Sequence, residues 1–259
     1  MLSTFVSYRN ITHDLTRSLK TAATQGAAKN DIANWRANIA RVTSINAFLG
    51  NTRLLNFAMK AYGLSDMAYA KGFIRKVLEG GVEKPGSFAN RLTDPRYRQF
   101  AAAFDFAKFG QFTTGNPTLQ NETVDKYLRQ TLEENAGASN EGVRLALYFQ
   151  RKAPAIASPL SILADKALLS VVKTTLGLPA SFSNAPIDTQ TAAIAKKLDV
   201  KSLKDPIKLE HFLQRFASLY DLQNGDQSAS APLVAITRGS EAGVGFDALM
   251  SIAHLRRGG

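Results

Sequence analysis

Apolar residues along this sequence recur at the spacing of an α-helix rather than in the alternation typical of a strand. Asp205 and Pro206 precede one clear apolar stripe, which consists of Leu209, Phe212, Leu213, Phe216 and Tyr220. An aspartate can cap the first turn of a helix and a proline suits its first position, so the pair marks a helix start. Asp94 and Pro95 repeat this signal. Strands are hard to place anywhere, and the pattern therefore predicts an all-α, multi-helix bundle.

The same periodicity and the capping residues predict further helices. We expect them over parts of 4–22, 29–40, 65–79, 94–110, 121–134, 141–152 and 188–198. Ser65 and Asn121 are the expected caps of two of them, and Gly110 is positioned to end the helix that starts at Asp94. The segment between Val143 and Phe149 is apolar almost all round, which is typical of a helix buried at the centre of a bundle.

A segment of the first half of the chain recurs in the second half. Residues 42–64 align without gaps on 156–178, with six of 23 positions identical. In each copy a serine opens a short helical turn, an asparagine or aspartate caps the next helix, and a glycine ends it. These pairs are Ser44 and Ser158, Asn51 and Asp165, and Gly63 and Gly177.

The recurrence predicts two related helical units, about 42–110 and 156–222, within a bundle over 1–222. A central buried pair of helices between 121 and 152 would join them, with the apolar helix packed against both units. Arg53, Lys60 and Tyr62 change in the second copy. What recurs is therefore the apolar packing pattern and the residues that start and end the helices, rather than a functional site.

The C-terminal part of the chain has a different composition. Residues 223–245 are rich in Gly, Ser, Ala, Asn and Asp, which is typical of a flexible linker. Residues 246–259 predict an amphipathic helix whose apolar face is formed by Phe246, Leu249, Met250 and Ala253. This helix either folds back on the bundle or docks on a partner protein, and its apolar face is the candidate docking site.

The formal net charge of +11 raises the question of an anionic partner. The basic residues are spread thinly over the chain, apart from one local cluster formed by Lys196, Lys197, Lys201, Lys204 and Lys208. Asp199 and Asp205 interrupt this cluster. A solvated helix face explains such interspersed charges, and contact with phosphate or another anion is the alternative.

Several kinds of chemistry find no support in the residues. The chain has no cysteine, its three histidines lie far apart, and it has neither a phosphate-binding glycine motif nor a G-x-S-x-G nucleophile turn. We predict no catalytic residue, no metal site and no cofactor. No apolar run reaches the about 20 residues of a membrane-spanning helix.

Some residues that could act in catalysis or ligand binding are better explained by structural roles. Glu133 and Glu134 fit the charged, exposed end of a helix. Near Asp94, Tyr97 and Phe100 fit the core, while Arg96 and Arg98 would remain in solvent. Trp35, among alanines, is expected to anchor packing rather than to stack on a ligand.

Longer motifs in the chain closely resemble an uncharacterised bacterial family, domain of unknown function 1217. The motifs are MLSTFVSYR, RLLNFAMKAYGLSDMAYAKGFIRKVL, SFANRLTDPRYRQFAAAFDFA, VDKYLRQTLEE, NEGVRLALYFQRKAP and LKDPIKLEHFLQRF. The resemblance implies an all-helical protein encoded among flagellar genes, and it carries no catalytic residue.

Together these observations lead to a hypothesis about function. We expect a non-enzymatic, flagellum-associated protein that acts in assembly or as a structural or adaptor component, with a flagellar protein as partner. It would reside in the bacterial cytoplasm, or be associated with or exported to the flagellar apparatus. The alternative is a basic helical module that binds nucleic acid or another anionic partner, of which nucleic acid is the less expected.

Overall fold

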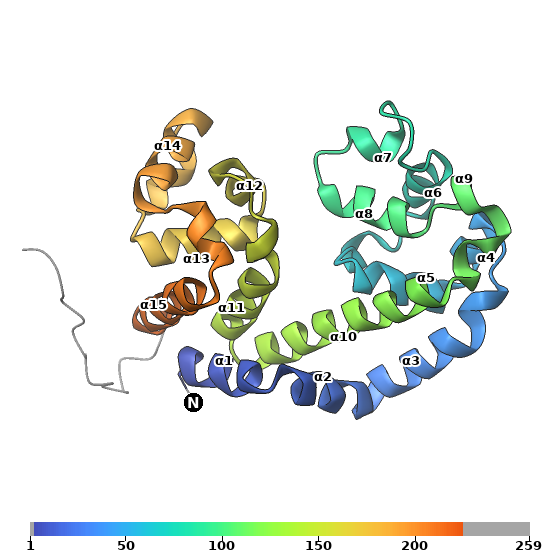
Figure 1. The fold of residues 1–259 in the computed structure, drawn as a ribbon, viewed down its shortest axis with the longest axis horizontal. Helices are drawn as coiled ribbons and strands as arrows, with labels where there is room; N and C mark the ends of the chain where they lie inside the picture. The colour runs from blue at the N-terminus through green and yellow to red at the C-terminus, as the bar shows by residue number, and fades with distance from the viewer. Residues whose placement is uncertain (1–2, 225–259) are drawn as a thin grey trace, which may run out of the picture. The chain divides into compact units, whose positions relative to one another are not determined.

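The computed structural model describes residues 3–224, and every regular element in that range is a helix. The all-α prediction is therefore confirmed (Figure 1). The first part of the chain contains α1 (Thr4–His13), α2 (Leu15–Thr24), α3 (Gly26–Asn38), α4 (Ile45–Gly50), α5 (Thr52–Ala61), α6 (Lys71–Glu79), α7 (Phe88–Arg91), α8 (Pro95–Ala103) and α9 (Phe106–Phe109). The second part contains α10 (Pro117–Ser139), α11 (Glu141–Lys152), α12 (Pro159–Leu163), α13 (Lys166–Leu176), α14 (Ile187–Lys197) and α15 (Pro206–Asn224).

Aspartate or asparagine followed by proline starts three of these helices. The Asp94 carboxylate accepts a hydrogen bond from the Arg96 amide, and Asp205 accepts from the amides of the first turn of α15, as predicted. A third pair, Asn116 and Pro117, starts α10 in the same way. The prediction that Asn121 caps this helix was wrong, because the pair five residues earlier supplies the same start signal.

Two other predicted helices differ in the structure. The helix expected over 94–110 is divided into α8 and α9. Asp105 caps the start of α9, because its carboxylate accepts a hydrogen bond from the Lys108 amide at 3.0 Å. Gly110, with φ of 51°, ends the second piece. Ser65 starts only a short 3₁₀ turn, and α6 begins later, at Lys71.

One hydrophobic core is rich in aromatic side chains. Trp35 is fully buried and stacks on Phe57 with 4.7 Å between ring centroids, and Phe48 stacks on Phe104 at 5.0 Å. The Trp35 indole N–H also donates to the Gln120 carbonyl oxygen at 3.3 Å. Trp35 therefore anchors the packing, as the sequence predicted. This core, the aromatic core below, is built from α3 to α10.

A second core is mainly aliphatic and is built from α1 and α11 to α15. Its fully buried members include Leu147, Val172, Ile194 and Leu213. The buried apolar side chains of α11 all belong to this aliphatic core, so the expectation that α11 packs on both units was wrong. It is α10 that reaches both cores, because its first half packs in the aromatic core and Ala136 packs against the aliphatic one.

The recurring segment forms the same helix ends in both places. Gly63 and Gly177 have φ of 70° and 61°, which is the left-handed conformation that glycine adopts without strain. The next residue folds back in each case, because the Leu64 amide donates to Met59 O at 2.8 Å and the Leu178 amide to Lys173 O at 2.9 Å. The local motif recurs, and the relation between the larger units, 42–110 and 156–222, stays a prediction.

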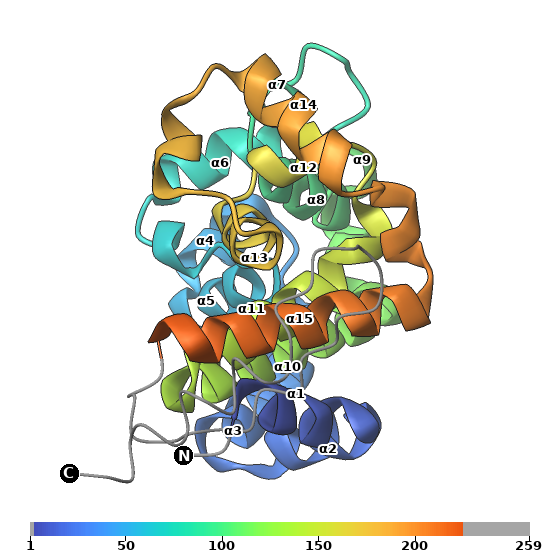
Figure 2. The same ribbon diagram turned by 90° about the vertical axis from the view of Figure 1, so that its left-hand side faces the viewer.

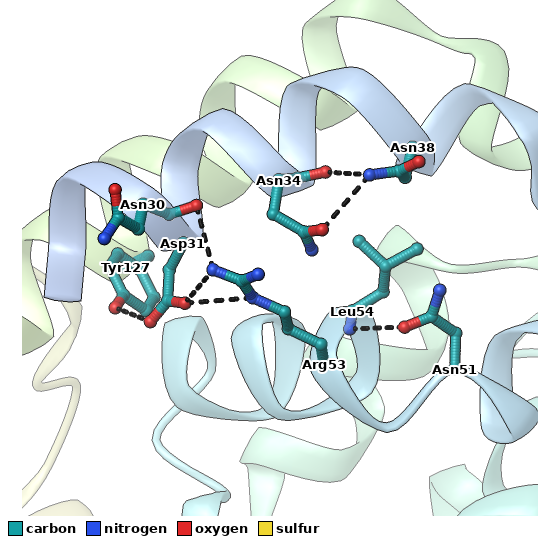
Figure 3. Close-up of polar contacts among 8 residues, drawn as sticks. All are labelled: Asn30, Asp31, Asn34, Asn38, Asn51, Arg53, Leu54 and Tyr127. Atoms are coloured by element: carbon teal, nitrogen blue, oxygen red, sulfur yellow. Dashed lines mark hydrogen bonds and ion pairs between the residues drawn. The ribbon is translucent and has the colours of Figure 1, made fainter.

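The polar residues that change between the two copies have packing partners in the first. Arg53 of α5 donates to the Asp31 carboxylate at 3.1 Å and to the Asn30 carbonyl oxygen, and the Tyr127 hydroxyl donates to the other Asp31 oxygen at 3.0 Å (Figure 3). Asn51 caps the same helix through the Leu54 amide. Asp31 thus connects α3, α5 and α10, and Arg53 serves to position α5.

The start of α1 is fixed to the end of α15. The Asp221 carboxylate accepts hydrogen bonds from the Thr4 amide, at 2.9 Å, and from the Thr4 hydroxyl, and the Asn140 side-chain amide donates to that hydroxyl at 3.0 Å. Gly142 of α11 lies against the same junction. Three helix ends that are distant in sequence therefore meet at one buried threonine.

The predicted C-terminal elements fall mostly outside the described residues. Helix α15 continues to Asn224, two residues past the predicted end of the bundle, so the first two residues of the predicted linker are helical. The rest of 223–245 and the helix predicted over 246–259, with Phe246, Leu249, Met250 and Ala253, lie outside the described range. No helix within 3–224 is long and apolar enough to cross a membrane.

Gly142 offers a direct test of this junction. A Cβ at that position would lie 2.5 Å from Tyr220 Cδ1 and 2.9 Å from Thr4 Cγ2, so Gly142→Ala should destabilise the protein by about 1–3 kcal/mol. Gly72, also the second residue of its helix, has no atom within 4 Å of the corresponding position. Gly72→Ala should leave stability unchanged or raise it by up to about 1 kcal/mol. Urea unfolding, followed by the fluorescence of the single tryptophan, compares the two variants. Equal effects would contradict the packing described here.

Candidate functional site

Glu133 of α10 is the most buried charged side chain that forms an ion pair in the described structure. Its side chain is 2% exposed, so the prediction that it belongs to an exposed helix end was wrong. The neighbouring Glu134 does face solvent, with 45% of its side chain exposed, and pairs with Lys60 at 2.8 Å. Adjacent helix residues point in different directions, which is why one glutamate is buried and the next is not.

Two arginines neutralise the Glu133 carboxylate. Arg151 of α11 donates from Nε to Oε1 at 2.7 Å and from Nη2 to Oε2 at 2.8 Å, which is a bidentate pair. Arg129, one turn earlier on α10, donates from Nε to Oε1 at 3.3 Å. Its Nη2 donates to the Gln150 side-chain oxygen at 3.2 Å. The three charged residues, called the Arg–Glu–Arg cluster below, connect α10 to α11.

The two arginines of the cluster have opposite pKa shifts. Burial lowers the pKa of Arg129, and the single long bond to Glu133 does not offset it. Burial also disfavours the charge of Arg151, but the two short bonds to Glu133 and its negative charge outweigh this and raise the pKa. The carboxylate is thus held mainly by Arg151.

Tyr8 of α1 lies beside the same cluster. Burial, reinforced by the charge of Glu210, raises the pKa of the Tyr8 hydroxyl to about 12, although the positive charge of Arg129 acts in the opposite direction. The ring itself is part of the aliphatic core. A tyrosine so difficult to ionise is suited to packing rather than to proton transfer near neutral pH.

A second polar group lies along α11. The Tyr148 hydroxyl donates to Asp165 Oδ2 at 2.5 Å, while the other oxygen of Asp165 caps α13 through the Ala167 and Leu168 amides. Burial and the Asp165 bond raise the pKa of Tyr148. Lys152 Nζ lies 5.7 Å from the centre of the Tyr148 ring, and burial together with the charge of Arg151 lowers the pKa of this lysine.

Arg96 keeps 37% of its side chain exposed to solvent, as expected in part, but its guanidinium also has partners that the sequence did not indicate. Its guanidinium donates from Nε and Nη2 to Asp94 Oδ2 at 2.9 and 2.7 Å, and it also donates to the Gly63 carbonyl oxygen. Burial would raise the pKa of Asp94, but the hydrogen bonds and charge of Arg96 outweigh burial and lower it. Tyr97 and Phe100 are buried and Arg98 is exposed, as expected. Arg96 therefore fixes the end of α5 to the start of α8.

The charged groups just described are engaged with one another. Both Glu133 oxygens accept hydrogen bonds from arginine, and Asp165 and Asp94 are similarly occupied. A general base requires a partly desolvated carboxylate with an oxygen that is free to accept a proton. None of these three carboxylates is free in this sense. Within residues 3–224, no group of three or more His, Asp or Glu side chains could hold a metal ion.

The predicted anion-contacting lysines lie on three consecutive elements. Lys196 and Lys197 are in the last turn of α14, Lys201 and Lys204 are in the 3₁₀ turn Val200–Lys204, and Lys208 is in α15. All five are exposed, and none forms an ion pair with a described residue. The structure therefore places all five lysines on the surface.

A pair of exposed aromatic side chains stands out on the surface. Phe109 of α9 is 52% exposed and Phe112 of the following 3₁₀ turn is 75% exposed. They line a shallow groove of about 250 Å³ whose other apolar residues are Ala102, Ala103 and Leu119. We call this surface the Phe109–Phe112 patch. The sequence did not predict this patch, because Phe109 and Phe112 lie on either side of the predicted helix end at Gly110 and belong to no periodic apolar stripe.

Comparison with known proteins places the chain in a family. Residues 61–209 match the family described as "Protein of unknown function (DUF1217)". The chain belongs to the DUF1217 family. Its structure is similar to the X-ray crystal structure of protein AGR_C_984 from Agrobacterium tumefaciens, with 44% sequence identity and a TM-score of 0.77. The similarity covers 86% of this chain and 97% of the other. No curated protein matches the chain.

The Arg–Glu–Arg cluster of this DUF1217 protein lies within the matched residues 61–209, but local spacing in the sequence does not predict it. A glutamate four residues after an arginine is common on exposed helices. Only the third partner, Arg151, which lies 18 residues further on, makes the pair a buried one. The one signal in the sequence was the position of Arg151 directly after the mostly apolar segment between Val143 and Phe149.

Removal of the Glu133 carboxylate should be costly. Glu133→Ala leaves two poorly solvated arginines without their anion, and we expect a loss of about 3 kcal/mol in the free energy of unfolding. Glu134→Ala removes an acid from the next position on the same helix, where it is exposed, and should cost about 0–1 kcal/mol. Chemical denaturation of both variants measures the difference. If Glu133→Ala were as stable as Glu134→Ala, the cluster would not hold α10 to α11.

Proposed function

We propose that this DUF1217 protein is a non-enzymatic, flagellum-associated protein that acts by binding other proteins, in assembly or as a structural or adaptor component. The observation that carries the proposal is the Phe109–Phe112 patch. Large aromatic side chains that remain exposed beside an apolar groove are typical of a protein-binding surface. Aromatic residues are also frequent among those that contribute most to binding energy.

The buried polar groups support the same proposal. Arg129, Glu133 and Arg151 stabilise one another between α10 and α11, and Tyr148 and Asp165 fix α11 to α13. Such interactions favour a rigid helical scaffold that presents surfaces to partners. The flagellar setting rests on the sequence resemblance to the family, whose members are expected among flagellar genes.

Gene deletion and complementation test the proposal. Deletion should reduce swimming or filament formation, and the wild-type gene should restore it. The double variant Phe109→Ser, Phe112→Ser should fold normally, because both side chains are exposed, but should fail to restore swimming. Leu160→Ser changes another exposed apolar residue, 54% exposed and located in α12, and should complement fully. Normal swimming and normal filaments in the deletion strain would refute the flagellar role.

A basic module that binds nucleic acid or another anion is the second candidate. It is favoured by one observation, namely that Lys196, Lys197, Lys201, Lys204 and Lys208 are all exposed and free of ion pairs with described residues. Exposed lysines that are not paired with acids are available to contact phosphate.

A salt titration with duplex DNA distinguishes this candidate from the first. Under it, log affinity should fall with log salt by a slope of about 0.9 per phosphate neutralised. Replacement of the five lysines by glutamine should then reduce that slope. Under the leading proposal no complex forms even at low salt. A gel shift that the glutamine variant does not alter would exclude these lysines as the contact site.

A further inference from the structure

The outward side of α15 carries exposed aliphatic and basic side chains together. Figure 2 shows this helix lying across the front of the described structure. Its inward side is buried in the aliphatic core. The outward side, called the α15 face below, consists of exposed residues at the spacing of one helix face: Ile207, Lys208, His211, Arg215, Ser218 and Leu222. Ile207 is 68% exposed and Leu222 is 72% exposed, so two large aliphatic side chains lie in solvent among basic ones.

The acids of this region are each engaged by another group. Asp199 and Asp205 cap helical turns, because their carboxylates accept hydrogen bonds from backbone amides. The Asp221 carboxylate belongs to the junction with the start of α1. Glu210 lies beside the α15 face and pairs with Arg9 of α1 at 3.9 Å. The α15 face itself therefore contains no acid.

The basic side chains of the same region are not engaged in this way. Residues 196–224 contain six basic and four acidic side chains, which gives a net charge of +2 with histidine neutral. Lys201 and Lys204 are three residues apart in a 3₁₀ turn, and side chains at this spacing lie above one another. These two lysines, Lys208 and Arg215 are exposed, and their side chains form no hydrogen bond or ion pair with a described residue. This surface therefore favours an anionic partner.

The exposed aliphatic residues indicate which kind of anionic partner fits. Leu222 follows Ile207 by 15 residues, which corresponds to about 22 Å along the helix axis. Side chains so far apart do not form one compact anchor for a protein pocket, but both can enter a flat surface. The phosphates of a nucleic acid do not stabilise aliphatic groups, whereas the apolar region beneath lipid headgroups does. Lysine and arginine beside such groups contact anionic headgroups. The α15 face thus matches an anionic lipid surface.

We propose that the α15 face binds the surface of an anionic lipid bilayer. Helix α15 lies in the plane of that surface, and Ile207 and Leu222 enter the boundary between headgroups and acyl chains. Lys204, Lys208 and Arg215 contact the anionic headgroups. The attachment is peripheral and needs no membrane-spanning helix. This inference rests on the second candidate function, a basic module that binds an anion, and names the anionic partner.

Flotation of the full-length protein with lipid vesicles tests the proposal. The probe is a vesicle of phosphatidylcholine with about 30% phosphatidylglycerol, and the comparison vesicle is phosphatidylcholine alone. We expect the partition coefficient for the anionic vesicle to be at least about tenfold higher at low salt, because several basic residues act together. Added salt should lower binding to the anionic vesicle, since it screens the attraction.

Matched variants test the aliphatic contacts. The double variant Ile207→Ser, Leu222→Ser should weaken binding to the anionic vesicle by about tenfold, because it removes both groups that enter the bilayer. Both side chains are exposed, so the variant should fold normally, which tryptophan fluorescence checks. Leu160→Ser changes an exposed apolar residue of α12 and should alter binding by less than about twofold.

A second pair of variants tests the basic contacts. Lys204→Gln with Lys208→Gln removes two positive charges and should weaken binding by about tenfold or more. Lys29→Gln with Lys76→Gln removes the same charge at exposed positions of α3 and α6, and should alter binding by less than about threefold. The comparison separates contact at the α15 face from the effect of net charge.

Several outcomes would overturn the inference. They are no binding to the anionic vesicle at low salt, equal binding to the two vesicles, no effect of the serine variant, or equal effects of the two glutamine variants. The salt titration with duplex DNA is a separate measurement. A complex with DNA but none with vesicles would overturn the lipid partner and leave the second candidate function standing. The motility test is independent of both, because a deletion strain that swims normally refutes the flagellar role without altering the vesicle result.

Discussion

The Arg–Glu–Arg cluster between α10 and α11 is the interaction on which the rest of the described structure depends. Helix α10 carries Leu119, Val124 and Tyr127 into the aromatic core, and α11 is the central helix of the aliphatic core. A buried carboxylate costs several kcal/mol in lost hydration, and only well-placed donors compensate for it. Arg151 and Arg129 supply those donors from two helices, so the angle at which α11 leaves α10 is fixed by charge as well as by packing.

Other polar contacts fix the surrounding helices in a similar way. Asp31 joins α3, α5 and α10, and Asp221 holds the start of α1 against the end of α15. In each case one carboxylate accepts hydrogen bonds from more than one element or group. These contacts give the two cores a defined arrangement of helices, which apolar burial alone specifies less strictly because it is not directional.

The surfaces show the reverse pattern. Phe109 and Phe112 expose aromatic area beside a groove that Ala102, Ala103 and Leu119 also line. The described structure thus combines satisfied interior charges with exposed aromatic area, the combination on which the proposed binding role rests. Similarity to the crystal structure of the Agrobacterium tumefaciens protein agrees with this fold.

The sequence by itself determined the helical fold and many helix ends, because caps, prolines and glycines act through neighbouring backbone groups. The starts at Asp94 and Asp205 and the stops at Gly63 and Gly177 followed from residues only a few positions apart. Tertiary structure alone decided that Glu133 is buried and that Arg96 binds the end of α5. The partners of those side chains lie up to 33 residues away, and local spacing does not indicate which distant side chains will share a desolvated site.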